Sequence, residues 1–144
     1  MIIITKRFQF CAAHRYWNRN WSEERNQSVF GKDTRVHGHN YQLEVSFAGE
    51  VDPDTGFIVD LGDVRKIVTD QVVDLLDHTQ IEKDLPWFAD RQPSSENVVV
   101  FIWQQLEPHF AGPARLAKIR LYETPTIYTE YLGGNDDQLT RDDI

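Results

Sequence analysis

The stretch DTRVHGHNYQLEVSF, residues 33–47, decides the fold of this chain. Apolar residues alternate with polar ones along its second half, and one parity holds Tyr41, Leu43, Val45 and Phe47. Successive side chains of a β-strand point to opposite faces, so this alternation predicts a strand over residues 36–51 with one buried face. Two histidines, His37 and His39, stand two positions apart at the start of that strand. The pattern therefore places two imidazoles on the same face.

Three further segments of the chain show the same strand periodicity. They are residues 2–13, 116–123 and 127–132, of which the last two are expected to form a hairpin. The Pro/Asp/Gly-rich sequence VDPDTG is typical of a turn, so a short strand over residues 57–60 is expected to pair back across it.

Two segments predict helices. Residues 63–76 have apolar side chains three or four positions apart, and residues 94–110 begin with capping serines before an amphipathic run. Residues 15–35, apart from one helical turn near SEER, and residues 76–93 are expected to form loops. This order of elements predicts an α+β domain, in which the helices cover one face of a sheet.

The composition fits one domain without a membrane span or a nucleic-acid partner. The chain has 144 residues, a net charge of −8 and a single cysteine, Cys11. It holds no apolar run near the ~20 residues that a membrane helix needs, and its acidic character argues against binding phosphate backbones. Residues 1–133 are expected to form the domain and residues 134–144 a disordered acidic tail. A cytoplasmic location is the expectation.

The charge is unevenly distributed along the chain. Residues 1–40 contain seven lysines and arginines against three acidic residues, although the whole chain is acidic. This imbalance indicates either a local anion site or scattered surface charge, and the sequence leaves both interpretations open.

His37 and His39 suggest a metal site. Their α-carbons should lie about 6.6 Å apart on one face of the strand. A third ligand is expected from His14, which ends the neighbouring strand on the parity of its apolar face. Three imidazoles with one open position are typical of catalytic zinc and unlike the oxygen ligands of magnesium. Alternatively, these histidines are structural or surface residues, which the spacing alone does not exclude.

Two further features indicate candidate catalytic or binding residues. Asp77 and His78 are adjacent, and a carboxylate beside an imidazole can orient it for proton transfer. Glu123 lies near the end of an apolar strand, where it is either a surface residue or an acceptor for the paired N–H groups of a heterocycle.

Together and in order, these motifs resemble the 6-pyruvoyl-tetrahydropterin synthase and 6-carboxytetrahydropterin synthase family. The resemblance runs from Lys6 to Gly133. It rests on FQFCAAHRY, FGK followed by HGHNY, VDPDTGFIVDLGDVRK, LLDHTQIEKDLPWFAD, SSENVVVFIW and IRLYET. It implies the tunnelling fold, or T-fold, in which an antiparallel four-stranded sheet carries two helices on one face. It also implies a homo-hexamer, a dimer of trimers with active sites between subunits.

The resemblance further implies the chemistry. The enzyme would be a zinc-dependent lyase that eliminates triphosphate from 7,8-dihydroneopterin triphosphate and gives 6-pyruvoyl- or 6-carboxy-tetrahydropterin. Its zinc ligands would be His14, His37 and His39, its proton relay Asp77 and His78, and its pterin anchor Glu123 and Thr124. The nearest cations for the triphosphate are Lys32, Arg35 and Arg15. The pathway stays open between tetrahydrobiopterin, queuosine-type and folate biosynthesis.

The sequence departs from the family at one position. Asp33 stands where the family commonly has a cysteine general base, and Cys11 has the opposite strand parity from His14. A solvated carboxylate is a far weaker base than a thiolate. Three interpretations follow: Asp33 is the base of a side-chain cleavage that gives 6-hydroxymethyl-dihydropterin, His78 and Asp33 share the base role of an ordinary synthase, or the chain is a non-catalytic zinc- and pterin-binding paralogue.

Overall fold

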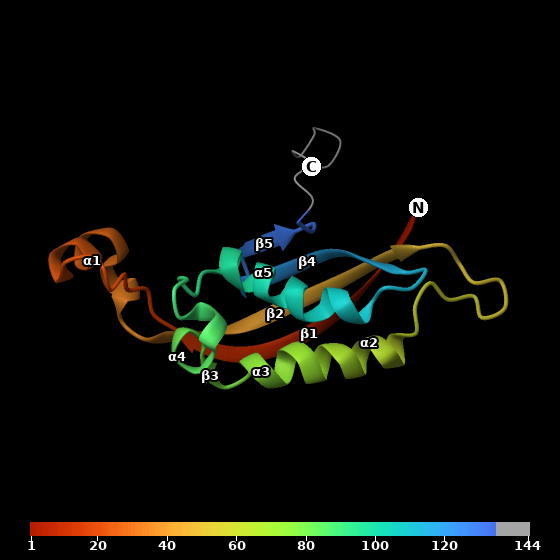
Figure 1. Cartoon of the computed structure of the whole chain (residues 1–144), viewed down its shortest axis with the longest axis horizontal. Coiled ribbons are helices and arrows are strands. Elements are labelled where there is room, and N and C mark those ends of the chain that lie inside the picture. The colour runs from red at the N-terminus through yellow and green to blue at the C-terminus, as the bar shows by residue number, and fades with distance from the viewer. Residues whose placement is uncertain (135–144) are drawn as a thin grey trace.

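A curved sheet forms the body of the computed structural model, which describes residues 1–134 (Figure 1). Its strand order is β3-β1-β2-β4-β5. β1 (Ile2–His14) and β2 (His37–Gly49) are antiparallel and pair along their full length, from Ile2 opposite Gly49 to His14 opposite His37. β4 (Arg115–Thr124) pairs antiparallel with β2, and β5 (Ile127–Tyr131) pairs antiparallel with β4.

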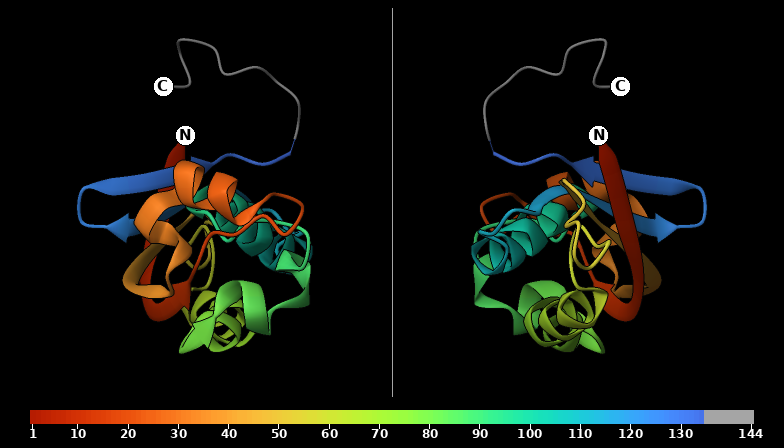
Figure 2. Two further views of the ribbon diagram at one scale, coloured as in Figure 1. Left: turned by 90° about the vertical axis from the view of Figure 1, so that its left-hand side faces the viewer. Right: turned by 90° about the vertical axis from the view of Figure 1, so that its right-hand side faces the viewer.

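Both long helices cover the same face of the sheet (Figure 2). The first begins as α2 (Leu61–Val68), passes through a π-helical segment (Thr69–Val73) and ends as α3 (Asp74–Leu76). The Asp60 side chain caps it by accepting hydrogen bonds from the backbone N–H groups of Gly62 and Asp63. The second is α5 (Ser95–Leu106), which the Ser94 hydroxyl caps. Both expected helices are confirmed.

The core lies between the sheet and these helices. The β2 residues Tyr41, Leu43, Val45 and Phe47 are all at most 1% exposed, as the alternation predicts. They belong to one cluster with the helix residues Val64, Val68, Val72, Leu76, Val98, Ile102 and Leu106. His14 continues the buried face of β1 and is 0% exposed, so an ionisable ring stands at the end of an apolar layer.

The segment between β1 and β2 contains a helix that the sequence indicated only as a single turn. α1 (Glu23–Phe30) is followed by a 3-10 turn (Gly31–Thr34), and the pair projects beyond the end of the sheet (Figure 1). Asn26 is completely buried and holds this arm together. Its side chain accepts from the backbone N–H of Asn18 and donates to the carbonyls of Asn18 and Ser22.

Two expectations about strands are wrong. Residues 57–60 form no strand; the chain turns at Asp52, whose N–H bonds the Phe57 carbonyl, and runs on to the Asp60 cap. A fifth strand, β3 (Thr79–Gln80), lies in the segment expected to be a loop and pairs parallel with Ala12 and Ala13 of β1. Within residues 1–134 the sheet has five strands, one more than the four that the resemblance implied.

The remaining elements are short. They are α4 (Ile81–Asp84) and the 3-10 turns Pro86–Phe88 and Glu107–His109. Across residues 1–134, no helix has the length and apolar character needed to span a membrane. The tail expected at residues 134–144 lies outside the described residues, apart from Gly134.

Candidate metal and pterin site

Three histidine side chains converge where β1 ends and β2 begins. His14 lies directly opposite His37 in the strand register, and His39 lies opposite Ala12. Each histidine offers one nitrogen such that the three nitrogens lie within 4.8 Å of one another. His14 is buried and the other two are partly buried. The structure therefore brings together the three residues that the sequence predicted as metal ligands.

Backbone carbonyls orient two of the three rings. His14 Nδ1 donates to the Pro93 carbonyl at 2.7 Å, and His37 Nδ1 donates to the Arg35 carbonyl at 2.8 Å. A carbonyl can only accept, so Nδ1 carries the proton and the Nε2 lone pair stays free for a metal. These carbonyls were missed in the sequence because every residue has one, and no pattern marks Pro93 as a partner of His14.

The spacing of the ring nitrogens fits a divalent ion. His14 Nε2 and His39 Nε2 lie 3.2 Å apart. Tetrahedral zinc with Zn–N bonds of about 2.0–2.1 Å holds its ligand atoms roughly 3.3 Å from one another. Without a metal, His39 Nε2–H can donate to the lone pair of His14 Nε2 at this distance, and a metal ion would replace that proton. The donor set and its spacing therefore suit zinc.

Burial favours the neutral form of His14 and His39. Desolvation is the main cause that lowers the pKa of both His14 and His39, and the charge of the neighbouring His37 lowers it further. A lowered histidine pKa means that the neutral, metal-binding form persists to a lower pH than for a solvated histidine.

Glu123 reaches the same cluster from the end of β4. Its Oε1 lies 3.4 Å from His14 Nε2 and 3.3 Å from His39 Nε2, and its side chain is 18% exposed. Burial, followed by the negative charge of Glu123, raises the pKa of Tyr16 and Tyr41, so both phenols stay protonated beside the site. Thr124 follows Glu123, with its Oγ1 3.3 Å from the backbone nitrogen of Thr126, which donates to it. The carboxylate predicted to be functional lies at the site.

Asp33, Lys32 and Arg35 lie at the exposed rim. Asp33 is on the 3-10 turn that precedes β2, and its Oδ1 lies 3.9 Å from His37 Nε2 with the side chain 62% exposed. The Asp33 carbonyl accepts from the Tyr16 N–H, which fixes the turn to the chain after β1. Lys32 and Arg35 flank it and are exposed.

Asp77 and His78 form a tight pair at the edge of β1. Asp77 Oδ2 lies 2.9 Å from His78 Nδ1, while Asp77 Oδ1 accepts from the Cys11 N–H at 2.9 Å. The hydrogen bond from Cys11, and then that from His78, lower the Asp77 pKa. His78 adopts a left-handed conformation with φ 62° and donates its N–H to the Cys11 carbonyl. A non-glycine residue in this region is uncommon and points to a local constraint.

This pair does not join the three histidines within one chain. The His78 side chain is 80% exposed, and Cys11, to whose backbone the pair is attached, points away from the face that carries His14. Among residues 1–134, no hydrogen bond or ion pair links Asp77 or His78 with His14, His37 or His39. The candidate site of a single chain thus contains the histidines, Glu123 and Asp33, and the proposed relay is not bonded to it, although His78 and His39 line one shallow cleft.

A curved, mostly antiparallel sheet that gathers three histidines and a carboxylate at one end defines an α+β protein with a candidate metal site. The profile of the family described as 6-pyruvoyl tetrahydropterin synthase matches residues 3–134. The chain is 37% identical over 132 residues to the 6-pyruvoyl tetrahydrobiopterin synthase of Pongo abelii, and the alignment covers 90% of each chain. The 6-carboxy-5,6,7,8-tetrahydropterin synthase of Rickettsia bellii is 24% identical over 147 residues, or 90% of this chain and 99% of that protein.

A solved structure supports the same relationship. The 6-pyruvoyl tetrahydropterin synthase of Caenorhabditis elegans superposes with a TM-score of 0.86 at 33% identity, over 92% of this chain and 96% of that one. The chain belongs to the 6-pyruvoyl tetrahydropterin synthase family. The resemblance and the T-fold that it implied are confirmed, and the chain is a lyase of this type.

Proposed function

We propose that the chain is a zinc-dependent lyase that acts on 7,8-dihydroneopterin triphosphate. It eliminates triphosphate and gives 6-pyruvoyl- or 6-carboxy-tetrahydropterin. The observation that carries this proposal is the convergence of His14, His37 and His39 in a chain of this family, with backbone carbonyls leaving Nε2 of His14 and His37 free for a metal.

The three histidines would hold the zinc. When bound, the metal supplies Lewis acidity toward an oxygen of the pterin side chain, which makes an adjacent C–H easier to deprotonate. Burial lowers the pKa of His14 and His39 and so favours their neutral form, and the Pro93 and Arg35 carbonyls hold the rings of His14 and His37.

Glu123 and Thr124 would anchor the pterin. A carboxylate accepts two parallel N–H bonds well, and the amino-pyrimidine edge of a pterin presents such a pair. Glu123 lies within 3.4 Å of two of the histidines, so a heterocycle held by it would have its side chain close to the metal ligands.

His78, oriented by Asp77, would transfer protons to and from the substrate. That substrate would be held at the histidine cluster of another subunit. The pair is attached to the β1 backbone, the His78 side chain is 80% exposed, and neither residue forms a hydrogen bond to the histidines of its own chain within residues 1–134. We therefore propose an assembly, a hexamer built as a dimer of trimers, in which the pair of one subunit serves the histidines of a neighbour.

One observation favours a second reaction. Asp33 takes the place of the family cysteine and lies 3.9 Å from His37 Nε2. As the base it would direct the enzyme toward cleavage of the side chain and a 6-hydroxymethyl-dihydropterin product. Its side chain is 62% exposed, however, and nothing in residues 1–134 of a single chain encloses it with a substrate, so we retain the first reaction with the Asp77–His78 pair in proton transfer.

Product identity tests the proposal. The zinc-loaded protein, incubated with 7,8-dihydroneopterin triphosphate, is expected to release tripolyphosphate and a pyruvoyl or carboxy pterin, identified by mass spectrometry. Hydroxymethyl-pterin would instead establish the second reaction, and pterin binding without turnover would overturn both.

The Asp33 position is expected to steer the outcome. Asp33→Ala should reduce turnover by about 100-fold or more if the carboxylate is the base, and by only a few-fold if His78 acts alone. Asp33→Cys is expected to increase formation of the pyruvoyl product, because a thiolate is the stronger base. Zinc content should match the wild type in both variants, since Asp33 is not among the converging ligands.

Zinc retention should depend on pH in a defined direction. Protons compete for neutral imidazoles, and burial lowers the pKa of His14 and His39. The metal is therefore expected to stay bound above pH ~6.5, the usual histidine pKa, and to be lost only below it. Metal analysis after dialysis at stepped pH measures this midpoint. Loss of half of the zinc at or above pH 7 would contradict the proposed ligand set.

A further inference from the structure

We propose that a basic cleft behind His14 binds a linear polyphosphate group. This inference rests on the proposed function, because the substrate named there carries such a group and its elimination releases tripolyphosphate. The cleft has a volume of about 780 Å³. It presents four cationic side chains and two carboxylates, namely Arg15, Arg19, Lys83, Arg91, Glu82 and Asp90. This excess of positive charge stands in a chain whose net charge is −8.

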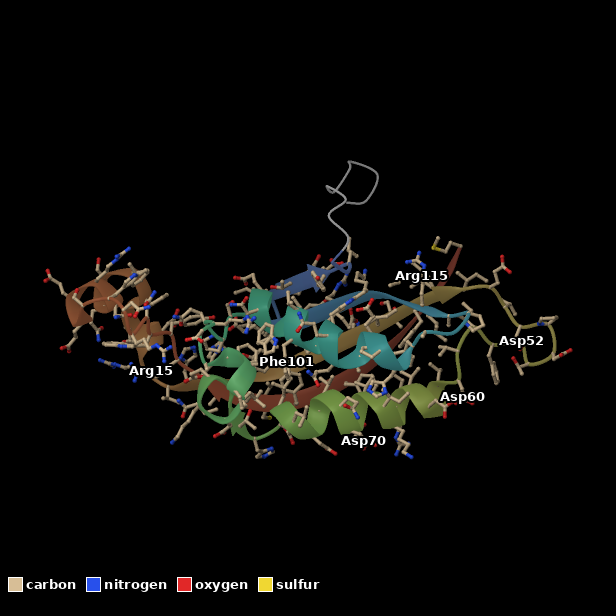
Figure 3. The ribbon with its side chains drawn as sticks, in the orientation of Figure 1. Arg15, Asp52, Asp60, Asp70, Phe101 and Arg115 are labelled. Carbon is tan, nitrogen blue, oxygen red and sulfur yellow. The ribbon has the colours of Figure 1, made fainter. Side chains whose placement is uncertain are left out.

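The cleft shares a wall with the histidine cluster. Arg15 directly follows His14 on the chain, and Pro93, which lines the cleft, is the residue whose carbonyl holds His14 Nδ1 at 2.7 Å. Figure 3 shows Arg15 where the projecting α1 arm joins the sheet. An anion in the cleft would therefore lie on the far side of the His14 ring from the converging Nε2 atoms.

Arg15 offers an unused hydrogen-bond donor. Its Nε is buried and has no hydrogen-bond partner within residues 1–134. Its guanidinium lies 4.8 Å from the centre of the Trp17 ring, which restrains the side chain. A buried donor without a partner is unfavourable, and a phosphate oxygen is the acceptor that an arginine fork best accommodates.

The other cations are available to different degrees. Lys83 is exposed and forms no ion pair with any described residue. Arg91 stacks on Trp87 at 4.1 Å and donates through Nη1 to the Trp87 carbonyl, which holds its guanidinium in place. Arg19 is paired with Asp90 at the exposed rim. Lys83 and Arg91 thus supply charge that the protein itself leaves unneutralised.

Glu82 indicates which anion the cleft would select. Its Oε1 accepts from the Arg15 N–H and from Gln80 Nε2, but its Oε2 is buried without a partner. A ligand must therefore provide an acceptor for Arg15 Nε and a donor for Glu82 Oε2. A terminal phosphate with its second pKa near 6 can do both, because one of its oxygens still carries a proton part of the time at neutral pH. Sulfate carries no such proton.

Direct binding of inorganic tripolyphosphate tests the cleft. In calorimetric titrations of the full-length protein, tripolyphosphate should bind at least about tenfold more tightly than sulfate. The double variant Lys83→Gln/Arg91→Gln should weaken tripolyphosphate at least about tenfold, because it removes two charge-assisted contacts. Arg115→Gln, at the opposite end of the sheet, is the matched control and should change nothing (Figure 3). Binding of biopterin, which has no phosphate, should be the same in all variants.

The outcomes separate this inference from the proposed function. Equal tripolyphosphate affinity in the double variant and the wild type would overturn the cleft, as would no preference over sulfate. If only the variant Lys32→Gln/Arg35→Gln lost tripolyphosphate affinity, the phosphates would bind at the exposed rim, and the cleft proposal would also be overturned. If the wild type bound no pterin but bound tripolyphosphate, and the double variant lost that binding, the proposed function would be rejected and the cleft proposal would stand. A raised KM for the triphosphate substrate in the double variant would identify the bound group as the substrate's tail, and an unchanged KM as free polyphosphate.

Discussion

His37→Ala is expected to remove the zinc and abolish turnover without unfolding the protein. His37 begins β2, and its side chain is 31% exposed, so its truncation leaves no cavity in the core, in contrast to the fully buried His14. Two imidazoles remain, and zinc held by two protein ligands binds far more weakly than zinc held by three. Because altering even an outer-shell partner costs 10- to 100-fold, we expect affinity to fall by more than about 100-fold.

Metal analysis, chelator competition and circular dichroism measure this result together. His109→Ala is the matched control, since His109 is exposed on the 3-10 turn after α5 and belongs to no metal cluster within residues 1–134. It should retain full zinc content. If the His37→Ala protein kept one zinc per chain with unchanged affinity, the three-histidine site would not be the metal site, and the proposed lyase chemistry would lose its basis.

The strands and the histidine cluster were predictable because a single periodicity fixes both. Once residues 41–47 are assigned to a strand by their apolar parity, the direction of His37 and His39 follows, and the parity of β1 brings His14 to the same face. The register, with His14 opposite His37, is the one in which both buried faces coincide. A slip of one residue would turn every core side chain outward.

What the sequence did not predict depends on tertiary contacts. Residues 57–60 have the apolar character of a strand, but Asp60 caps α2, and the chain must leave the sheet to reach that helix. β3 has only two residues and exists because Asp77 and His78 are attached to the Cys11 backbone next to it. The contacts to Cys11 have no local sequence signal, whereas the Asp60 cap has one, an aspartate just ahead of the helical run, which the turn-and-strand interpretation of residues 51–60 overlooked.

The sequence did not predict the basic cleft either. Arg15 was singled out as a cation near the metal ligands, but Lys83 and Arg91 come from a segment some seventy residues later that was expected to be only a loop. The hydrogen bonds between Gln92 and the Trp17 backbone bring these segments together. Side-chain bonds to backbone groups can form at almost any sequence separation, so periodicity does not reveal them.

His78→Ala is expected to lower kcat by about 100- to 10,000-fold while zinc content and fold stay unchanged, because it removes a proton-transfer group and no metal ligand. The exposed position of His78 makes truncation harmless to packing. Asp74→Asn, an exposed acid on the same helix end, is the control and should leave kcat near that of the wild type. Asp77→Asn should also lower kcat, because the carboxylate that orients His78 would be lost.

The same variant decides whether the relay acts between subunits. His37→Ala chains lack a metal ligand but keep the Asp77–His78 pair, and His78→Ala chains have the reverse defect. Suppose that each active site takes its metal ligands from one chain and its relay from a neighbour. In oligomers assembled from an equal mixture, the ligands are intact at half of the sites and the relay is independently intact at half. Such oligomers should therefore regain roughly a quarter of wild-type activity. If one chain supplied both halves, every site in the mixture would stay defective and no activity would return. The pair is attached to the Cys11 backbone, is exposed and forms no hydrogen bond to the histidines of its own chain within residues 1–134, so we expect recovery.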